Sequence, residues 1–342
     1  ASLDARDARS RKALAMRRLA VLLERLVAGV KLLILTFLKR FILYMSKTSV
    51  HAIPDSEKFI DVEKVIGSKN PTLLKLLPRF VLKYIKRTVH QNELNNAIWR
   101  YKDRHGHAFV DAAMEEFGVK TKVVGAENIP LEGGVIMTAN HPLGGLDGIA
   151  FMDVAGDFRK DIKFFVNDIL MAIKNFDPIF IPVNKLGRNS PEYVQRFEEI
   201  YASSDCLLLF PAGLVSRKQS GKGIQDLVWK KSFVTKAIQH KKNIVPVFID
   251  GHNSNFFYNL AFWRKKIGIK ANVEMFYLVD EMYKQKGKTL TFTFGEPISW
   301  EVFTKDKPAE YWSEKVKQHT YALQSGDLSK MLPTIKNNVV SK

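Results

Sequence analysis

The most informative segment of this chain spans residues 135–148 and reads VIMTANHPLGGLDG. An apolar run ends at His141, and Asp147 follows six positions later. Histidine titrates near neutral pH and can take a proton from a hydroxyl, and a carboxylate on its other ring nitrogen would fix the tautomer. Because a proline and two glycines predict a loop after the run, Asp147 can fold back onto the ring. We interpret the two residues as a candidate base with its orienting carboxylate; the alternative is a strand end with a merely exposed histidine.

The pattern from about residue 120 onward predicts an α/β fold with a largely parallel central sheet flanked by helices. Short β-branched apolar runs alternate there with stretches of helical periodicity, which is typical of parallel sheets. The expected strands are 123–124, 134–138, 162–166, 179–183, 206–210, 244–249 and 290–294, and the expected helices are 146–155, 168–175, 190–203, 225–240, 254–266 and 307–325.

Polar residues or turns follow four of these strands, at His141, Asn184, Pro211 and Asp250. Ligands of open α/β sheets gather beyond the carboxyl ends of the strands. We therefore expect these four positions to line one crevice.

The chain divides by its pattern into four regions, 1–50, 51–118, 119–300 and 301–342. The second region reads as helical, and Pro78 is expected to break or kink it. Its helices either pack onto the α/β domain as a bundle or touch a membrane, and the sequence leaves both open. The third region is the α/β domain, and the fourth is a helical segment.

The first fifty residues are strongly basic, with eleven lysines and arginines against three acidic residues. Residues 13–44 read as one long helix, but charges interrupt every window of ~20 residues that could span a bilayer. The segment is expected either to lie at a membrane surface as a basic amphipathic helix, or to precede a natural start at Met45. No small-residue cleavage site follows it, so a secretory signal is not expected.

The 342-residue chain carries 53 basic and 35 acidic residues, a formal net charge of +18. Such a charge attracts polyanions, either nucleic acid or an anionic membrane surface. The cations alternate with apolar residues and no zinc-finger spacing occurs, which favours the membrane over nucleic acid. A non-catalytic membrane-binding or nucleic-acid-binding protein remains the alternative to an enzyme.

Several other classes of site are disfavoured. No Gly-x-Ser-x-Gly elbow of a serine hydrolase and no phosphate-binding loop occurs. The spacing of His and Cys predicts no metal site. The single cysteine, Cys206, lies in the apolar run CLLLF and is expected to be a buried, inert thiol.

Three further segments accompany the first, and they read IFIPVNK (179–185), LLFPAGLVSRK (208–218) and IVPVFIDG (244–251). Together and in this order they resemble the four blocks of the glycerolipid (lysophospholipid) acyltransferase superfamily, the PlsC-like enzymes. Asn140, His141 and Asp147 match the first block, 181–185 the second, Phe210, Pro211, Ala212 and Gly213 with Ser216 and Arg217 the third, and 245–247 the fourth. The resemblance covers roughly residues 120–300 and implies a glycerol-3-phosphate acyltransferase-like fold.

The blocks depart from the usual family pattern at three points. Five residues rather than four separate His141 from Asp147, Asn184 and Lys185 replace Asp-Arg, and Ala212 replaces glutamate. The last two changes fall where the family binds a glycerol-phosphate acceptor. The variants look more like a Bacteroidetes aminolipid branch, and a match in FIDVEKVI extends the resemblance towards residue 57. That branch implies an acceptor hydroxyl on a monoacylated glycine- or ornithine-type lipid, and 1-acylglycerol 3-phosphate is the alternative.

The resemblance implies a fatty acyl transfer from acyl carrier protein (ACP) or CoA thioester, as co-substrate and without another cofactor, to a lysolipid hydroxyl. His141 would be the general base and Asp147 its partner. Backbone N–H groups at 143–145 or near Gly213 are candidate oxyanion donors. The implied location is the cytoplasmic face of the inner membrane, peripheral or monotopic. The aromatic and basic residues of 256–266 either lie at the membrane interface or form an amphipathic helix that packs its aromatic side chains into the core.

The substrate-binding candidates come from the loop and the blocks. The cations among them would hold a carboxylate or phosphate, although each except Arg217 is more readily explained as a solvated surface charge. They are Asn140, Gly144, Gly145, Asn184, Lys185, Arg188, Phe210, Pro211, Gly213, Ser216, Arg217 and Lys218.

Overall fold

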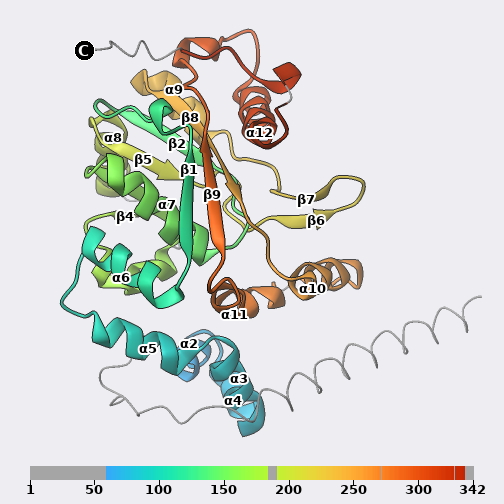
Figure 1. The fold of residues 1–342 in the computed structure, drawn as a ribbon. Helices are drawn as coiled ribbons and strands as arrows, with labels where there is room; N and C mark the ends of the chain where they lie inside the picture. The colour runs from blue at the N-terminus through green and yellow to red at the C-terminus, as the bar shows by residue number, and fades with distance from the viewer. Residues whose placement is uncertain (1–58, 184–190, 271, 327, 336–342) are drawn as a thin grey trace, which may run out of the picture. The chain divides into compact units, whose positions relative to one another are not determined.

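A seven-stranded sheet in the order β1-β9-β8-β2-β5-β3-β4 forms the centre of the computed structural model (Figure 1). All neighbouring strands pair in parallel except β8 and β9, so the prediction of a largely parallel sheet is confirmed. The strands are β1 (Lys120–Val124), β2 (Val135–Ala139), β3 (Ile162–Val166), β4 (Phe180–Pro182), β5 (Cys206–Leu209), β8 (Asn243–Asp250) and β9 (Thr289–Phe294).

The structure describes residues 59–183, 191–270, 272–326 and 328–335, all within one unit that spans Ile53–Lys342. The helix expected over residues 13–44 lies outside the described residues. Within the described ranges, no helix combines the length and the apolar character that crossing a bilayer requires.

The central strands β2, β5 and β8 are largely apolar and buried because helices cover both faces of the sheet. On one face, Met137 and Phe151 belong to a core that includes α6 (His107–Phe117) and α7 (Gly145–Phe158). On the other, Ile136 and Phe233 pack with side chains of α8 (Pro191–Ala202), α9 (Ser232–His240) and α12 (Ala309–Ser325). The Cys206 side chain is fully buried in the core that contains Met137 and Phe151. Burial raises the pKa of its thiol to about 12, which confirms the prediction of a buried, unreactive thiol.

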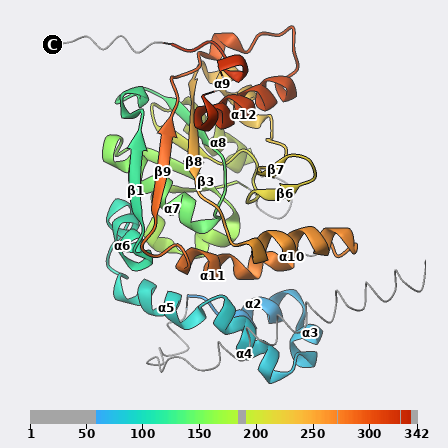
Figure 2. The ribbon, with the colours of Figure 1, turned by 45° about the vertical axis from the view of Figure 1, so that its right-hand side comes forward.

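The region before the sheet is helical, as its pattern predicts. It contains α2 (Val62–Lys69), α3 (Pro71–Leu76), α4 (Arg79–Thr88) and α5 (Gln91–Arg100). Pro78 separates α3 from α4 and caps the latter. The hydroxyls of Tyr84 and Tyr277 lie 2.9 Å apart, so α4 contacts the segment between α10 (Asn255–Lys266) and α11 (Leu278–Tyr283), which Figure 2 shows at one end of the sheet.

Three sequence expectations differ from the structure. The helix expected from residue 225 begins only at Ser232, because β6 (Arg217–Gln219) and β7 (Gly223–Gln225) form a hairpin first. Gly221 and Gly223 adopt φ of 72° and 73° in its turn, a conformation that glycine alone adopts readily. The stretch 168–175 forms two 3₁₀ turns, and α11 was not expected.

Candidate active site

His141 and Asp147 meet at the carboxyl edge of the sheet. His141 follows the end of β2, and Asp147 lies in the first turn of α7. The Nδ1 atom of His141 is 3.1 Å from each carboxylate oxygen of Asp147. The loop predicted after β2 therefore exists, but it ends at Gly144, and a helix rather than the loop carries the carboxylate to the ring.

Asp147 is fully buried and held by its own loop. The backbone N–H groups of Leu143 and Gly144 donate to its Oδ2 atom at 2.7 and 3.3 Å. Its position near the amino end of α7 adds the favourable dipole of that helix. The carboxylate is thus fixed before any substrate binds.

The imidazole of His141 is poised as a base. Its side chain is 16% exposed, and burial lowers its pKa. The charge and hydrogen bond of Asp147, with the charge of Asp226, outweigh burial, so the pKa of His141 lies above its ordinary value. Because Asp147 takes Nδ1, Nε2 is the nitrogen that can receive a proton from a substrate.

An aromatic ring covers one face of the imidazole. Phe210, which directly follows β5, stacks on His141 with ring centroids 4.1 Å apart and planes 16° from parallel. Phe164 and Phe151 support Phe210 from behind. This third-block residue therefore restricts the rotation of the His141 ring.

Comparison with known proteins decides the family. Residues 64–328 match the model of the family described as Acyltransferase. This chain belongs to that acyltransferase family. It is 45% identical over 270 residues, 79% of its length, to the lyso-glycine lipid O-acyltransferase of Bacteroides thetaiotaomicron, covering 99% of that relative. It is 42% identical over 280 residues, 82% of its length, to the enzyme of the same name from Phocaeicola vulgatus, covering all of it.

Among solved structures, the acyltransferase is similar to the 1-acyl-sn-glycerophosphate acyltransferase PlsC of Thermotoga maritima. The two are 17% identical with a TM-score of 0.39, and the match covers 78% of this chain and 92% of the other.

The acyltransferase holds the main chain of its histidine loop through several buried side chains. The Asn140 amide accepts the N–H of Ile249 at 2.7 Å and donates to its carbonyl at 3.0 Å, which ties the end of β2 to β8. Ser216 donates from its N–H to the carbonyl of His141 at 2.7 Å. Two of the predicted substrate-binding residues therefore position His141.

Arg217 is engaged inside the protein. Its guanidinium donates to Glu274 at 3.1 Å and to the Val215 carbonyl at 2.6 Å, and it stacks over Phe257 at 5.0 Å. Glu274 is fully buried and also pairs with Arg264 at 2.7 Å. The cation that the third block singles out is thus part of a buried ion pair, while the adjacent Lys218 is exposed on β6.

The remaining predicted residues divide into three groups. The N–H groups of Leu143 and Gly144 are bound to Asp147, and that of Gly213 donates to the Phe210 carbonyl at 3.0 Å, so among the expected oxyanion donors at 143–145 the N–H of Gly145 stays a candidate. Pro211 is buried, and a side chain at Gly145 would contact Met282 at 3.0 Å. Asn184, Lys185 and Arg188 lie outside the described residues.

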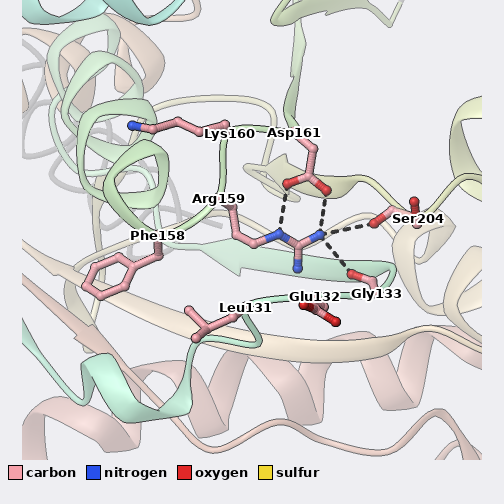
Figure 3. Close-up of a pocket in the computed structure, with 8 residues that line it drawn as sticks. All are labelled: Leu131, Glu132, Gly133, Phe158, Arg159, Lys160, Asp161 and Ser204. Atoms are coloured by element: carbon pink, nitrogen blue, oxygen red, sulfur yellow. Dashed lines mark hydrogen bonds and ion pairs between the residues drawn. The ribbon is translucent and has the colours of Figure 1, made fainter.

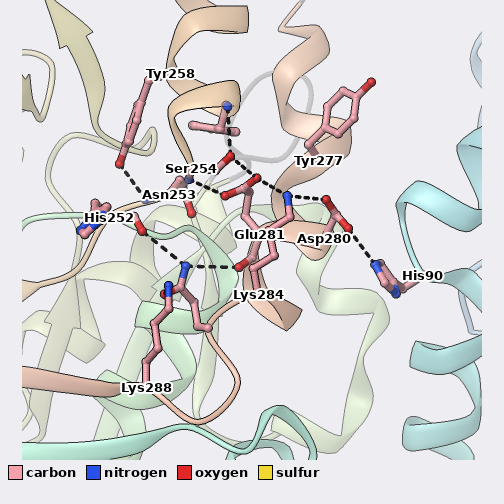
Figure 4. A network of polar contacts seen from close by, with 12 residues as sticks. His90, His252, Asn253, Ser254, Tyr258, Tyr277, Asp280, Glu281, Lys284 and Lys288 are labelled. Atoms are coloured by element: carbon pink, nitrogen blue, oxygen red, sulfur yellow. Dashed lines mark hydrogen bonds and ion pairs between the residues drawn. The ribbon is translucent and has the colours of Figure 1, made fainter. Parts of the chain in front are cut away.

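A chain of polar contacts supports the histidine loop from α10 and α11 (Figure 4). Asn253 donates to the Pro142 carbonyl at 3.2 Å. Next to it, Ser254 donates to the buried Glu281, which also binds Lys284. Lys284 also pairs with Asp280, and Asp280 in turn contacts His90 at the start of α5. No motif of the sequence indicates these residues, because their roles depend on contacts between distant segments.

A cavity of about 350 Å³ lies elsewhere, lined by residues that precede β2, β3 and β5 (Figure 3). It therefore opens at the amino edge of the sheet, opposite His141. Its buried Arg159 is bound to Asp161 and to the carbonyls of Pro130, Gly133 and Ser204. These bonds tie three loops together, which is a structural role.

Proposed function

We propose that this acyltransferase moves a fatty acyl group from an acyl thioester to the hydroxyl of a monoacylated amino-acid lipid, of which lyso-glycine lipid is the leading candidate. Residues 119–300 would supply the catalytic groups. The contact between His141 Nδ1 and the Asp147 carboxylate, at 3.1 Å, carries the proposal. The names of the two relatives support the choice of acceptor.

The transfer needs no covalent enzyme intermediate, because a thioester is already activated. Nε2 of His141 takes the proton of the acceptor hydroxyl as its oxygen attacks the thioester carbonyl carbon. The new C–O bond forms and the C–S bond breaks. The departing thiolate then receives the proton from the imidazolium, which Asp147 has stabilised meanwhile.

The acceptor is an amino-acid lipid rather than a glycerol phosphate in this proposal. Ala212 stands where the glycerol-phosphate enzymes have glutamate, and its side chain is buried. A glycine lipid presents one carboxylate, and exposed cations such as Lys218 at the hairpin are available for it. The donor is ACP or CoA thioester, and both belong in the assay.

The acceptor is a membrane lipid, so the enzyme must work at a bilayer surface, in this proposal the cytoplasmic face of the inner membrane. The α3–α4 face, defined here by Leu76, Arg79, Phe80 and Lys83, suits such a surface. Leu76 and Phe80 are 74% and 63% exposed, and both cations beside them are exposed. Apolar and basic side chains together bind anionic membranes.

The decisive experiment supplies purified enzyme with acyl-ACP or acyl-CoA and three acceptors in parallel. These are an N-(3-hydroxyacyl)glycine, an N-(3-hydroxyacyl)ornithine and a lysophosphatidate, with products detected by mass spectrometry. We expect transfer to the glycine lipid, and its loss in His141→Ala. His105→Ala, a change at an exposed histidine between α5 and α6, is the matched control. Undiminished transfer by His141→Ala would refute the mechanism, and preference for lysophosphatidate would refute the acceptor.

A further inference from the structure

A second carboxylate binds the main chain of the catalytic histidine. Asp226 follows β7 and is fully buried. Its Oδ1 atom accepts the backbone N–H of His141 at 3.1 Å and the hydroxyl of Ser216 at 2.5 Å. Its Oδ2 atom accepts the indole N–H of Trp229 at 2.8 Å. No step of the mechanism above uses this group.

The main chain of His141 is held on both sides by this arrangement. Asp226 takes its N–H, and the N–H of Ser216 occupies its carbonyl at 2.7 Å. Because Ser216 also binds Asp226, the three residues form a closed ring of hydrogen bonds. Such a ring fixes the backbone from which the imidazole projects, as precise placement of a reacting group requires.

The backbone of Asp226 is in turn braced by the C-terminal helix. Its N–H donates to the hydroxyl of Tyr321 at 2.8 Å, and its carbonyl accepts from Lys317 at 2.9 Å. Gln219 of β6 binds the same carbonyl at 2.8 Å. Asp226 therefore connects α12 and the β6–β7 hairpin to the histidine loop.

The charges that face the imidazole come from three elements. Asp147 approaches from α7, Asp226 from the segment after β7, and Arg217 from β6. Both carboxylates raise the pKa of His141, whereas Arg217, like burial, lowers it. Burial raises the pKa of Asp226 itself, against its bonds from Ser216, Trp229 and His141. A buried carboxylate is unfavourable unless its bonds compensate, and all three of these partners can donate to it.

We propose that Asp226 is a positioning residue for acyl transfer, which fixes the main chain of His141 and adds a second negative charge near the imidazole that Asp147 binds. The inference rests on the proposed role of His141 as general base. When His141 takes the hydroxyl proton, two negative groups stabilise the imidazolium instead of one.

The test removes the charge of Asp226 while keeping its shape. Asp226→Asn alone would turn an amide N–H towards the indole N–H of Trp229, a repulsive contact that could prevent folding. The double variant Asp226→Asn/Trp229→Phe avoids this contact, and Trp229→Phe alone provides the background against which it is read. Asp111→Asn, at an exposed carboxylate of α6, controls for the loss of one negative charge.

Relative to Trp229→Phe, we expect the double variant to lose roughly 10- to 100-fold in kcat, the effect of one charge-assisted hydrogen bond. The KM for the acceptor should stay within about threefold. The acid limb of the kcat–pH profile should move to lower pH, because His141 loses a group that raises its pKa. A purely structural role would leave that limb in place, and an unmoved limb therefore overturns the proposal.

A second readout does not depend on activity. The imidazole of His141 is titrated by NMR in Trp229→Phe and in the double variant, with Asp111→Asn alongside. We expect a lower titration midpoint in the double variant only. If the wild-type enzyme transfers no acyl group, the proposed function fails, whereas an equal midpoint in the two variants refutes the role of Asp226.

Discussion

At the scale of single residues, the site depends on how one imidazole is held. Asp147 binds Nδ1, Phe210 covers a face, and Asp226 and Ser216 hold the main chain. Each contact restricts a motion of the imidazole or of its main chain, so less conformational entropy is lost when the substrate hydroxyl binds. In the proposed mechanism, the imidazole therefore meets the substrate already oriented, with Nε2 as its reactive atom.

The first prediction concerns Asp147→Asn. The amide would place an N–H against the N–H groups of Leu143 and Gly144 or the ring, and it removes the charge that raises the pKa of His141. We expect kcat to fall by roughly 10²- to 10⁴-fold, as when a base loses its orienting carboxylate. Since only neutral histidine accepts a proton, the acid limb of the kcat–pH profile should shift to lower pH. A variant with a full kcat and an unshifted limb would contradict the assigned role.

At the scale of elements, close packing of β1 against β9 makes a prediction for Gly125. Gly125 follows β1 with φ of 76°, and a Cβ atom there would lie 2.3 Å from the Phe294 carbonyl oxygen. We expect Gly125→Ala to lower the free energy of unfolding by about 2 to 4 kcal/mol, from the strained φ together with the clash. Chemical denaturation measures this directly.

Gly133→Ala is the matched control for that change. Gly133 has nearly the same φ, 77°, but nothing lies within 4 Å of its added Cβ atom. Its substitution should lower the free energy of unfolding by only about 1 kcal/mol, from backbone strain alone. Equal losses in the two variants would show that packing of β9 on the turn after β1 is unimportant.

The elements that the sequence predicted best are those with a local cause. The runs at 135–139, 162–166 and 206–209 form strands within a residue of the expected bounds, because a parallel strand covered on both faces is largely apolar. The β6–β7 hairpin was missed although Gly221 and Gly223 signal a turn, since its strands are polar and short. Helix 255–266 was found, whereas the short α11 has too few residues for a recognisable period.

The site was predictable for the same reason, and only to the same extent. His141 and Asp147 lie six positions apart, so a short loop and the first turn of α7 bring them together. Asp226 reaches His141 across 85 positions, and its segment carries no pattern that indicates this contact. Likewise, the ion pair of Arg217 with Glu274 depends on the fold. A motif identifies residues near the chemistry, but the fold decides which of them face the substrate.

At the scale of the whole molecule, the net charge of +18 predicts binding to anionic membranes. The double variant Leu76→Glu/Phe80→Glu should bind anionic phospholipid vesicles at least tenfold more weakly in a co-sedimentation assay. The substitutions remove apolar contact and add charge repulsion at the α3–α4 face. Leu131→Glu, at a 67% exposed leucine near the amino edge of the sheet, is the control. Equal vesicle binding by the two variants would exclude this face as the docking surface.

The fold also predicts how stability depends on pH through His319 of α12. Its side chain is 1% exposed, and Nδ1 accepts the N–H of Leu332 at 3.1 Å. Burial lowers the pKa of His319 to about 4, below the ~6.5 of an unfolded chain. The unfolded state therefore binds a proton first as the pH falls. The contribution of neutral His319 to stability is complete above about pH 6.5 and declines until about pH 4, by up to ~3 kcal/mol.

His319→Phe should flatten this dependence. We expect its unfolding free energy, measured by urea denaturation, to change less between pH 6.5 and pH 4.5 than that of the wild-type enzyme, by about 2 kcal/mol. His105→Ala, at an exposed histidine, should keep the wild-type slope. The C-terminal helix that carries His319 also carries Lys317 and Tyr321, which brace Asp226. If the slope of His319→Phe equals that of the wild type, folding does not lower the pKa of His319, and the side of α12 that carries this residue is not the closely packed, water-excluded environment described here.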